Sequence, residues 1–97
     1  MKKLEAIEKI LVECDPVKLI KMGAPENEYS SEALTIYERI NRYTSVDQMQ
    51  IIIYNVFLES FGPKKETAER LIGTFDSYRE IAERVKAIIG DKIDVTP

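Results

Sequence analysis

The stretch 46-VDQMQIIIYNVFLESF-61 decides the architecture that we expect for this chain. Read as a helix, it has apolar residues around most of its circumference and not along one stripe: Met49, Ile51, Ile52, Ile53, Tyr54, Val56, Phe57, Leu58 and Phe61. A helix that is apolar nearly all round is buried on several sides. The segment is therefore predicted to be the central helix of a bundle, or to offer one face to a partner. The three consecutive isoleucines are also compatible with a strand.

The residues at the two ends of this stretch favour the helix. Ser45 and Gln48 match a capping box, in which each side chain bonds to a free backbone N–H of the other residue. Gly62 and Pro63 follow directly and cannot continue a helix.

The segment after it, residues 64–89, has the clearest helical periodicity in the chain. Its apolar residues alternate steps of three and four: Ala68, Leu71, Phe75, Tyr78, Ala82, Val85 and Ile89. One long helix is predicted here. Gly73 is its weak point, since glycine costs about 1 kcal/mol against alanine inside a helix. The alternative is a break at Gly73, with Thr74 capping a second helical piece.

Two further helices precede the central one. Residues 2–14 carry a stripe of Leu4, Ile7, Ile10, Leu11 and Cys14 at helical spacing. A second stripe of Ala33, Leu34, Ile36, Tyr37 and Ile40 predicts a helix that starts after an N-cap at Ser30 and ends near Tyr43.

The connection between these two helices, 15-DPVKLIKMGAPENEY-29, is unusually rich in turn-forming and acidic residues. Asp15 is expected to cap a short helix over residues 16–22, and Gly23 to end it in a left-handed conformation.

Together the segments predict an all-α fold: an antiparallel bundle of four main helices plus one short helical turn. Residues 1–90 are expected to form a single helical domain, and residues 91–97 a flexible C-terminal tail.

Composition limits the classes of function. The chain has 97 residues, of which 44% are apolar and 32% charged, and a net charge of −3. Its basic residues alternate with acidic ones, so it lacks the basic stripe that is typical of nucleic-acid binding. No apolar run reaches the length of a membrane span, and the charged N-terminus does not resemble a signal peptide. We therefore expect a cytoplasmic protein that binds neither nucleic acid nor membranes.

The residues that usually carry catalysis are scarce. The chain contains no histidine, one cysteine and four glycines. It therefore has no Cys–His pair, and it has no glycine-rich phosphate loop. Cys14, on the apolar stripe of the first helix, is interpreted as a buried structural thiol. No catalytic, cofactor-binding or metal-binding residue is assigned.

A candidate contact surface remains. Glu26, Asn27, Glu28 and Tyr29 are not needed to start or end a helix, and we expect them on an exposed turn. Tyr54, on the crowded central helix, is added because tyrosine is enriched at interfaces.

The segment DPVKLIKMGAPENEYSSEALTIYERI resembles a family of small uncharacterised bacterial helical proteins, a domain of unknown function. The family pattern D-P-h-x-L-h-x-x-G-x-P-x-[DN]-E-Y is matched by Asp15, Pro16, Leu19, Gly23, Pro25, Asn27, Glu28 and Tyr29, with Ile36-Tyr37 and Ser45 to Gln48 afterwards. The resemblance covers about the first sixty residues. It implies a small helical bundle from a Gram-positive-type bacterium, and it implies no activity.

Three functions follow as hypotheses. The first is a non-catalytic protein that acts through protein–protein contacts, with a partner protein or by self-association. The second is an immunity or antitoxin-like inhibitor, since a mildly acidic bundle can bind a basic toxin site. The third, a metal-dependent enzyme, requires the carboxylates of Asp15, Glu26 and Glu28 to converge on a cation.

Overall fold

The structure, a computed structural model, describes residues 2–16, 21, 23, 29–61 and 73–90. Over these residues the chain forms helices α1 (Lys2–Cys14), α2 (Ser30–Arg39), α3 (Val46–Phe61) and α5 (Arg79–Ile89), with the 3-10 turn η2 (Phe75–Tyr78) directly before α5. No strand occurs within the described ranges. The all-α prediction is confirmed, and α1 and α3 have the predicted bounds. The predicted short helix over residues 16–22 and the predicted tail over 91–97 lie largely or wholly outside the described residues.

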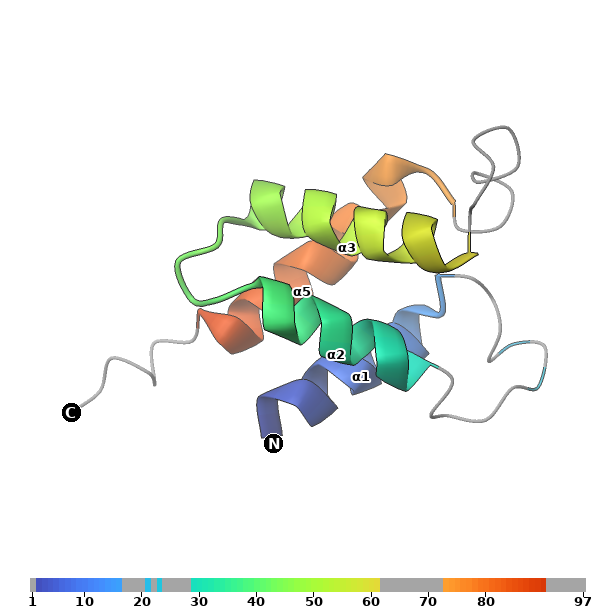
Figure 1. Ribbon diagram of the computed structural model, residues 1–97, viewed down its shortest axis with the longest axis horizontal. Helices are drawn as coiled ribbons and strands as arrows, with labels where there is room; N and C mark the ends of the chain where they lie inside the picture. Colours follow the sequence, from blue (N-terminus) through green and yellow to red (C-terminus); the bar gives the residue numbers. More distant parts are fainter. Residues whose placement is uncertain (1, 17–20, 22, 24–28, 62–72, 91–97) are drawn as a thin grey trace.

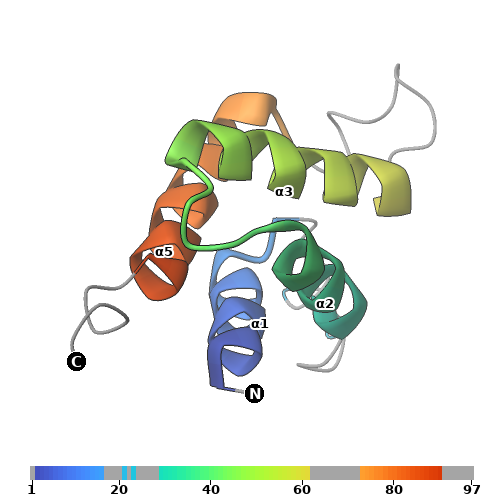
Figure 2. The ribbon, with the colours of Figure 1, turned by 60° about the vertical axis from the view of Figure 1, so that its left-hand side comes forward.

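The helices form a closed ring of neighbours around one core. α1 packs against α2 and α5, and α3 packs against α2, α5 and η2. Successive helices run in opposite directions along the long axis of the molecule (Figure 1). Figure 2 shows α3 above α1 and α2, with α5 beside α1. The contacts of α3 with three other elements explain why so much of its circumference is apolar.

Every helix contributes to the core. Its buried residues are Ile7, Ile10, Leu11, Tyr29, Ala33, Ile36, Met49, Ile53, Val56, Phe57, Tyr78, Ile81, Ala82, Val85 and Ile89. A row of five aromatic rings crosses it, in the order Tyr29, Phe57, Tyr78, Tyr54 and Phe75, with centroids 5.4–5.8 Å apart. The neighbouring rings are tilted or edge-to-face, which aromatic pairs prefer because of their quadrupoles.

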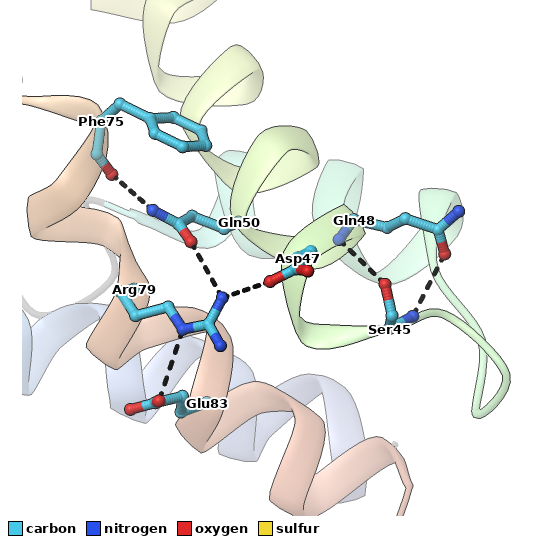
Figure 3. A network of polar contacts seen from close by, with 7 residues as sticks. All are labelled: Ser45, Asp47, Gln48, Gln50, Phe75, Arg79 and Glu83. Atoms are coloured by element: carbon cyan, nitrogen blue, oxygen red, sulfur yellow. Dashed lines mark hydrogen bonds and ion pairs between the residues drawn. The ribbon is translucent and has the colours of Figure 1, made fainter.

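The predicted capping box is present at the start of α3. Gln48 N–H donates to Ser45 Oγ at 3.1 Å, and Ser45 N–H donates to Gln48 Oε1 at 3.2 Å (Figure 3). The predicted cap of α2 is wrong. Ser30 is the first residue of that helix, and its hydroxyl donates to the carboxylate of Glu8 on α1.

α2 ends at Arg39, four residues before the predicted end near Tyr43. Asn41 accounts for the early stop. Its Oδ1 accepts the N–H of Tyr43 at 2.8 Å, and its carbonyl accepts the N–H of Thr44 at 3.0 Å. An asparagine that bonds to the backbone just ahead of it offers those N–H groups an alternative to helix.

The continuous helix predicted over residues 64–89 is also wrong, and the alternative break is correct. Gly73 has φ +85°, which an α-helix does not contain, and Thr74 is extended. Thr74 does not cap through its side chain; its carbonyl accepts the N–H and the hydroxyl of Ser77 at 3.1 and 2.6 Å. Gly23, the glycine that was predicted to be left-handed, has φ +99°.

Candidate functional site

The predicted contact surface is described at only two of its five positions. Glu26, Asn27 and Glu28 lie outside the described residues. Tyr29 is fully buried, so its assignment to an exposed surface is wrong. Its hydroxyl donates to Asp15 Oδ1 at 2.7 Å, and its ring packs on Phe57 with centroids 5.8 Å apart. Tyr29 is therefore a core residue that ties the start of α2 to the end of α1.

Asp15 has an internal structural role. It is 9% exposed and has a positive φ of 47°. In addition to the bond from Tyr29, its Oδ2 accepts the N–H of Lys21 at 2.9 Å. Both carboxylate oxygens thus accept bonds from the chain. Among the described residues, no group of three acidic, cysteine or histidine side chains is placed to hold a metal ion.

Cys14 is half-buried and lies against Arg84 of α5, whose Nη1 is 3.4 Å from Sγ. Burial raises the pKa of the Cys14 thiol, and the nearby Arg84 guanidinium partly opposes that effect. The thiol is therefore held in its protonated, weakly nucleophilic form near neutral pH. Arg84 also pairs with Glu13, so this contact joins α1 to α5.

Glu32 is a second buried carboxylate, and sequence reasoning did not single it out. Glu32 is 8% exposed, and its Oε1 has no hydrogen-bond partner within the part of the chain that the structure describes. The side chain lies in the first turn of α2, where the helix dipole and the free N–H groups favour negative charge. Among the described residues, Glu32 belongs to no group of three acidic, cysteine or histidine side chains that could hold a metal ion.

The clearest feature on the surface is an apolar stripe that we name the α3 outer face: Ile51, Tyr54 and Leu58 of α3 with Phe75 of η2. Ile51 is 49% exposed and Phe75 is 40% exposed, while Tyr54 and Leu58 are partly buried. The three α3 residues follow i, i+3, i+7 spacing, so they share one side of the helix. Tyr54 packs edge-to-face on Phe75 with centroids 5.4 Å apart, which makes the stripe continuous across the two elements.

A polar network holds η2 beside α3 (Figure 3). Gln50, which is 6% exposed, donates through Nε2 to the carbonyl of Phe75 at 3.0 Å. Its Oε1 accepts from Arg79 Nη1 at 3.3 Å, and the same guanidinium pairs with Asp47 and, at 3.4 Å, with Glu83. The bond to the Phe75 carbonyl holds the backbone of η2 beside α3, and the Phe75 ring packs on Tyr54. The α3 outer face is therefore a preformed surface.

Tyr54 is one of the contact residues expected from the sequence, whereas Ile51 was counted only among the apolar residues around the central helix and Phe75 was placed in a helical stripe. Their exposure depends on where α2 and α5 pack, which periodicity does not specify.

Comparison of the chain with protein-family models, with curated proteins and with solved structures finds no match. The resemblance to a bacterial family stays a prediction, and function has to be argued from the structure. Within the described part of the chain, no helix is both long enough and apolar enough to cross a membrane.

Proposed function

We propose that the protein is a non-catalytic helical protein that acts through protein–protein contacts, and that its α3 outer face binds a second copy of the chain. The observation that carries the proposal is the exposure of Ile51 and Phe75, 49% and 40%, on one continuous apolar stripe. Covering apolar surface gains about 25 cal/mol per Å². Large contiguous apolar patches on a protein surface are a usual mark of interaction sites.

The polar flanks of the stripe favour a second copy as the partner. On the α2 side, Arg39 pairs with Glu59 at 3.3 Å, and on the η2 side, Arg79 pairs with Asp47. The charged side chains beside the stripe are thus paired within the chain, and the stripe itself carries no charge. It therefore offers no charge that would favour a strongly acidic or strongly basic partner. A two-fold interface brings the same patch together from both copies. In an antiparallel pairing centred near Tyr54, Ile51 of one copy would meet Leu58 of the other.

The same features weigh against the other two hypotheses. An inhibitor of a basic toxin site needs an acidic contact surface, whereas the α3 outer face is uncharged. A carboxylate enzyme needs Asp15 to face a cation, whereas both of its oxygens accept bonds from the chain.

Light scattering after size-exclusion chromatography tests the proposal over a series of protein concentrations. We expect the apparent mass to rise from 11.2 kDa towards twice that value as the concentration increases. The Ile51→Glu variant should remain at the monomer mass, because the charge would be buried in the interface without a partner.

Leu34→Glu is the matched control. Leu34 is 43% exposed, close to the value for Ile51, but it lies on the side of α2 away from Arg39, which reaches α3. This variant should associate like the parent protein, and circular dichroism should show that both variants are folded. A monomer at every concentration, or equal loss of association in the two variants, would refute the proposal.

A further inference from the structure

Asn55 is a polar residue in the middle of the exposed apolar surface of α3. It is exposed, and it lies four residues after Ile51 and three residues before Leu58, so the three share one side of the helix. Its neighbour Tyr54 belongs to the α3 outer face through the ring contact with Phe75. Within the described part of the chain, no hydrogen bond uses the Asn55 side chain. Its amide is therefore available at the surface that the proposed dimer would cover.

An asparagine side chain can pair with the same residue of a second copy. Its amide carries N–H donors and a carbonyl acceptor, so two amides related by a two-fold axis can each donate to the other. A two-fold interface brings a residue that lies at the axis against its own counterpart. An amide that is covered without such a partner loses its bonds to water, which is costly. A position at the two-fold axis would therefore satisfy the Asn55 amide when the surface is covered.

The spacing of the α3 outer face places Asn55 at such a position. In the antiparallel pairing in which Ile51 meets Leu58 of the second copy, the centre of the pairing falls between Tyr54 and Asn55. The two Asn55 residues are then offset along the helix by one residue, about 1.5 Å. The two Ile51 residues are offset by seven residues, or about 10 Å. Asn55 is thus within reach of its own counterpart, whereas Ile51 is not.

Given the proposed dimer through the α3 outer face, on which this inference rests, we propose that Asn55 meets Asn55 of the second copy at the two-fold axis and sets the antiparallel register. The two reciprocal amide bonds form only when the copies are aligned about this residue. A shift by one helical turn would cover both amides with apolar side chains and leave them unpaired. A single buried asparagine fixes the register of coiled coils in the same way. The apolar contacts of Ile51 and Phe75 supply affinity, and Asn55 selects among the pairings that they allow.

A charge-exchange experiment tests whether residue 55 faces its own counterpart. Asn55→Asp and Asn55→Lys should each weaken self-association by about tenfold or more, because like charges would meet at the axis. An equal mixture of the two variants should associate more tightly than either variant alone, because aspartate then faces lysine. Light scattering at equal total protein concentration measures the three samples, and we expect the highest apparent mass in the mixture.

Ile51→Asp and Ile51→Lys are the matched pair that tests the register. Each variant should be monomeric, and so should their mixture, because the two charges would be about 10 Å apart and each would face Leu58. Restored association in both mixtures would indicate a parallel pairing, in which every residue of the face meets its counterpart, and would overturn the proposal. Residues 51 and 55 are exposed, so all four variants should fold, as circular dichroism would verify.

The role of Asn55 and the dimer itself can fail separately. If the parent protein associates and Ile51→Glu blocks association, but the Asn55 mixture gains nothing over its single variants, only the role of Asn55 is overturned. The same holds if Asn55→Asp and Asn55→Lys each associate like the parent protein. A parent protein that stays monomeric at every concentration overturns both the dimer and the role of Asn55.

Discussion

Asp15 shows at the scale of one residue how the corner between α1 and α2 is held. A buried carboxylate is costly unless hydrogen bonds replace its lost hydration. Here Tyr29 O–H and Lys21 N–H supply two of those bonds, from positions fourteen and six residues further along the chain. The positive φ of Asp15 is tolerated because aspartate visits the left-handed region more readily than most residues.

The Tyr29→Phe variant tests this arrangement. It keeps the ring that packs on Phe57 but removes the hydroxyl that donates to Asp15. We expect the free energy of unfolding to fall by about 1.5–3 kcal/mol, because a buried charged acceptor loses a donor. Urea denaturation measures the change. Tyr43→Phe is the control: its hydroxyl is exposed, so its loss should change stability by less than about 0.5 kcal/mol. If Tyr29→Phe lowered the free energy of unfolding no more than Tyr43→Phe does, the bond from the Tyr29 hydroxyl to Asp15 would not stabilise the protein.

The Cys14 thiol gives a prediction about pH. Burial raises its pKa in the folded protein, with Arg84 as the opposing influence. As pH rises, the unfolded chain therefore loses its thiol proton first, and stability falls between the ordinary thiol pKa and the raised one. Alkylation by iodoacetamide should have its midpoint at higher pH in the folded protein than in urea. Arg84→Gln should move that midpoint higher still, because the cation that favours thiolate is removed.

Arg39→Gln provides the comparison for the thiol measurement, since Arg39 pairs with Glu59 and is on a different helix from the Cys14 contact. Its alkylation profile should match that of the parent protein. A folded profile that coincides with the profile in urea would contradict the inferred pKa shift.

At the scale of the element, Gly73 decides where the last helix begins. Its φ of +85° belongs to the left-handed region, and an added Cβ would lie 2.9 Å from Ser77 Oγ. That hydroxyl is itself held by the carbonyl of Thr74. Gly73→Ala should therefore destabilise the protein by about 1–2 kcal/mol. In an unbroken helix the same change would stabilise by about 1 kcal/mol, so the sign of the change in urea denaturation distinguishes the two structures. Gly73→Asn should cost less than Gly73→Ala, because asparagine tolerates positive φ.

The elements that the sequence predicted well are those whose signals are local. The capping box joins Ser45 and Gln48, three residues apart, so its effect does not depend on the rest of the fold. The end of α2 was missed because its apolar period continues to Ile40, whereas Asn41 redirects the backbone bonds. The signal in the sequence is Asn41 itself, since asparagine is unfavourable inside helices and favoured in turns.

The candidate site was less predictable, because burial depends on partners far along the chain. Tyr29 is buried by contacts with Asp15 and Phe57, and neither partner is indicated by the turn composition around it. For α3, the excess of apolar residues left two alternatives open, a central helix of the bundle or a helix with one face for a partner. Which residues form that face follows from the packing of α2 and α5, and so it became known only from the structure.

At the scale of the whole molecule, the ring of helices and its aromatic row form one connected interior. Phe57 is central, because its ring contacts Tyr29 at the start of α2 and Tyr78 at the start of α5. The row then continues through Tyr54 to the exposed ring of Phe75. The interior of the bundle and the α3 outer face are thus parts of the same packed structure. Removing the Phe57 ring should therefore destabilise every helix.

Urea unfolding tests that connection. The chain has no tryptophan, so tyrosine fluorescence reports largely on the buried row, while far-ultraviolet circular dichroism reports on all helices. One core predicts a single two-state transition with the same midpoint by both probes. Phe57→Leu should lower both midpoints together, by an amount that corresponds to about 1–2 kcal/mol. Leu34→Ala, at a position that is 43% exposed, should leave both midpoints nearly unchanged.

If Phe57→Leu lowered the fluorescence midpoint but left the circular dichroism midpoint unchanged, the helices would have to unfold as separate units. The ring of contacts from α1 through α2, α3 and α5 argues for the single transition, because no helix can leave it without exposing the buried faces of two neighbours.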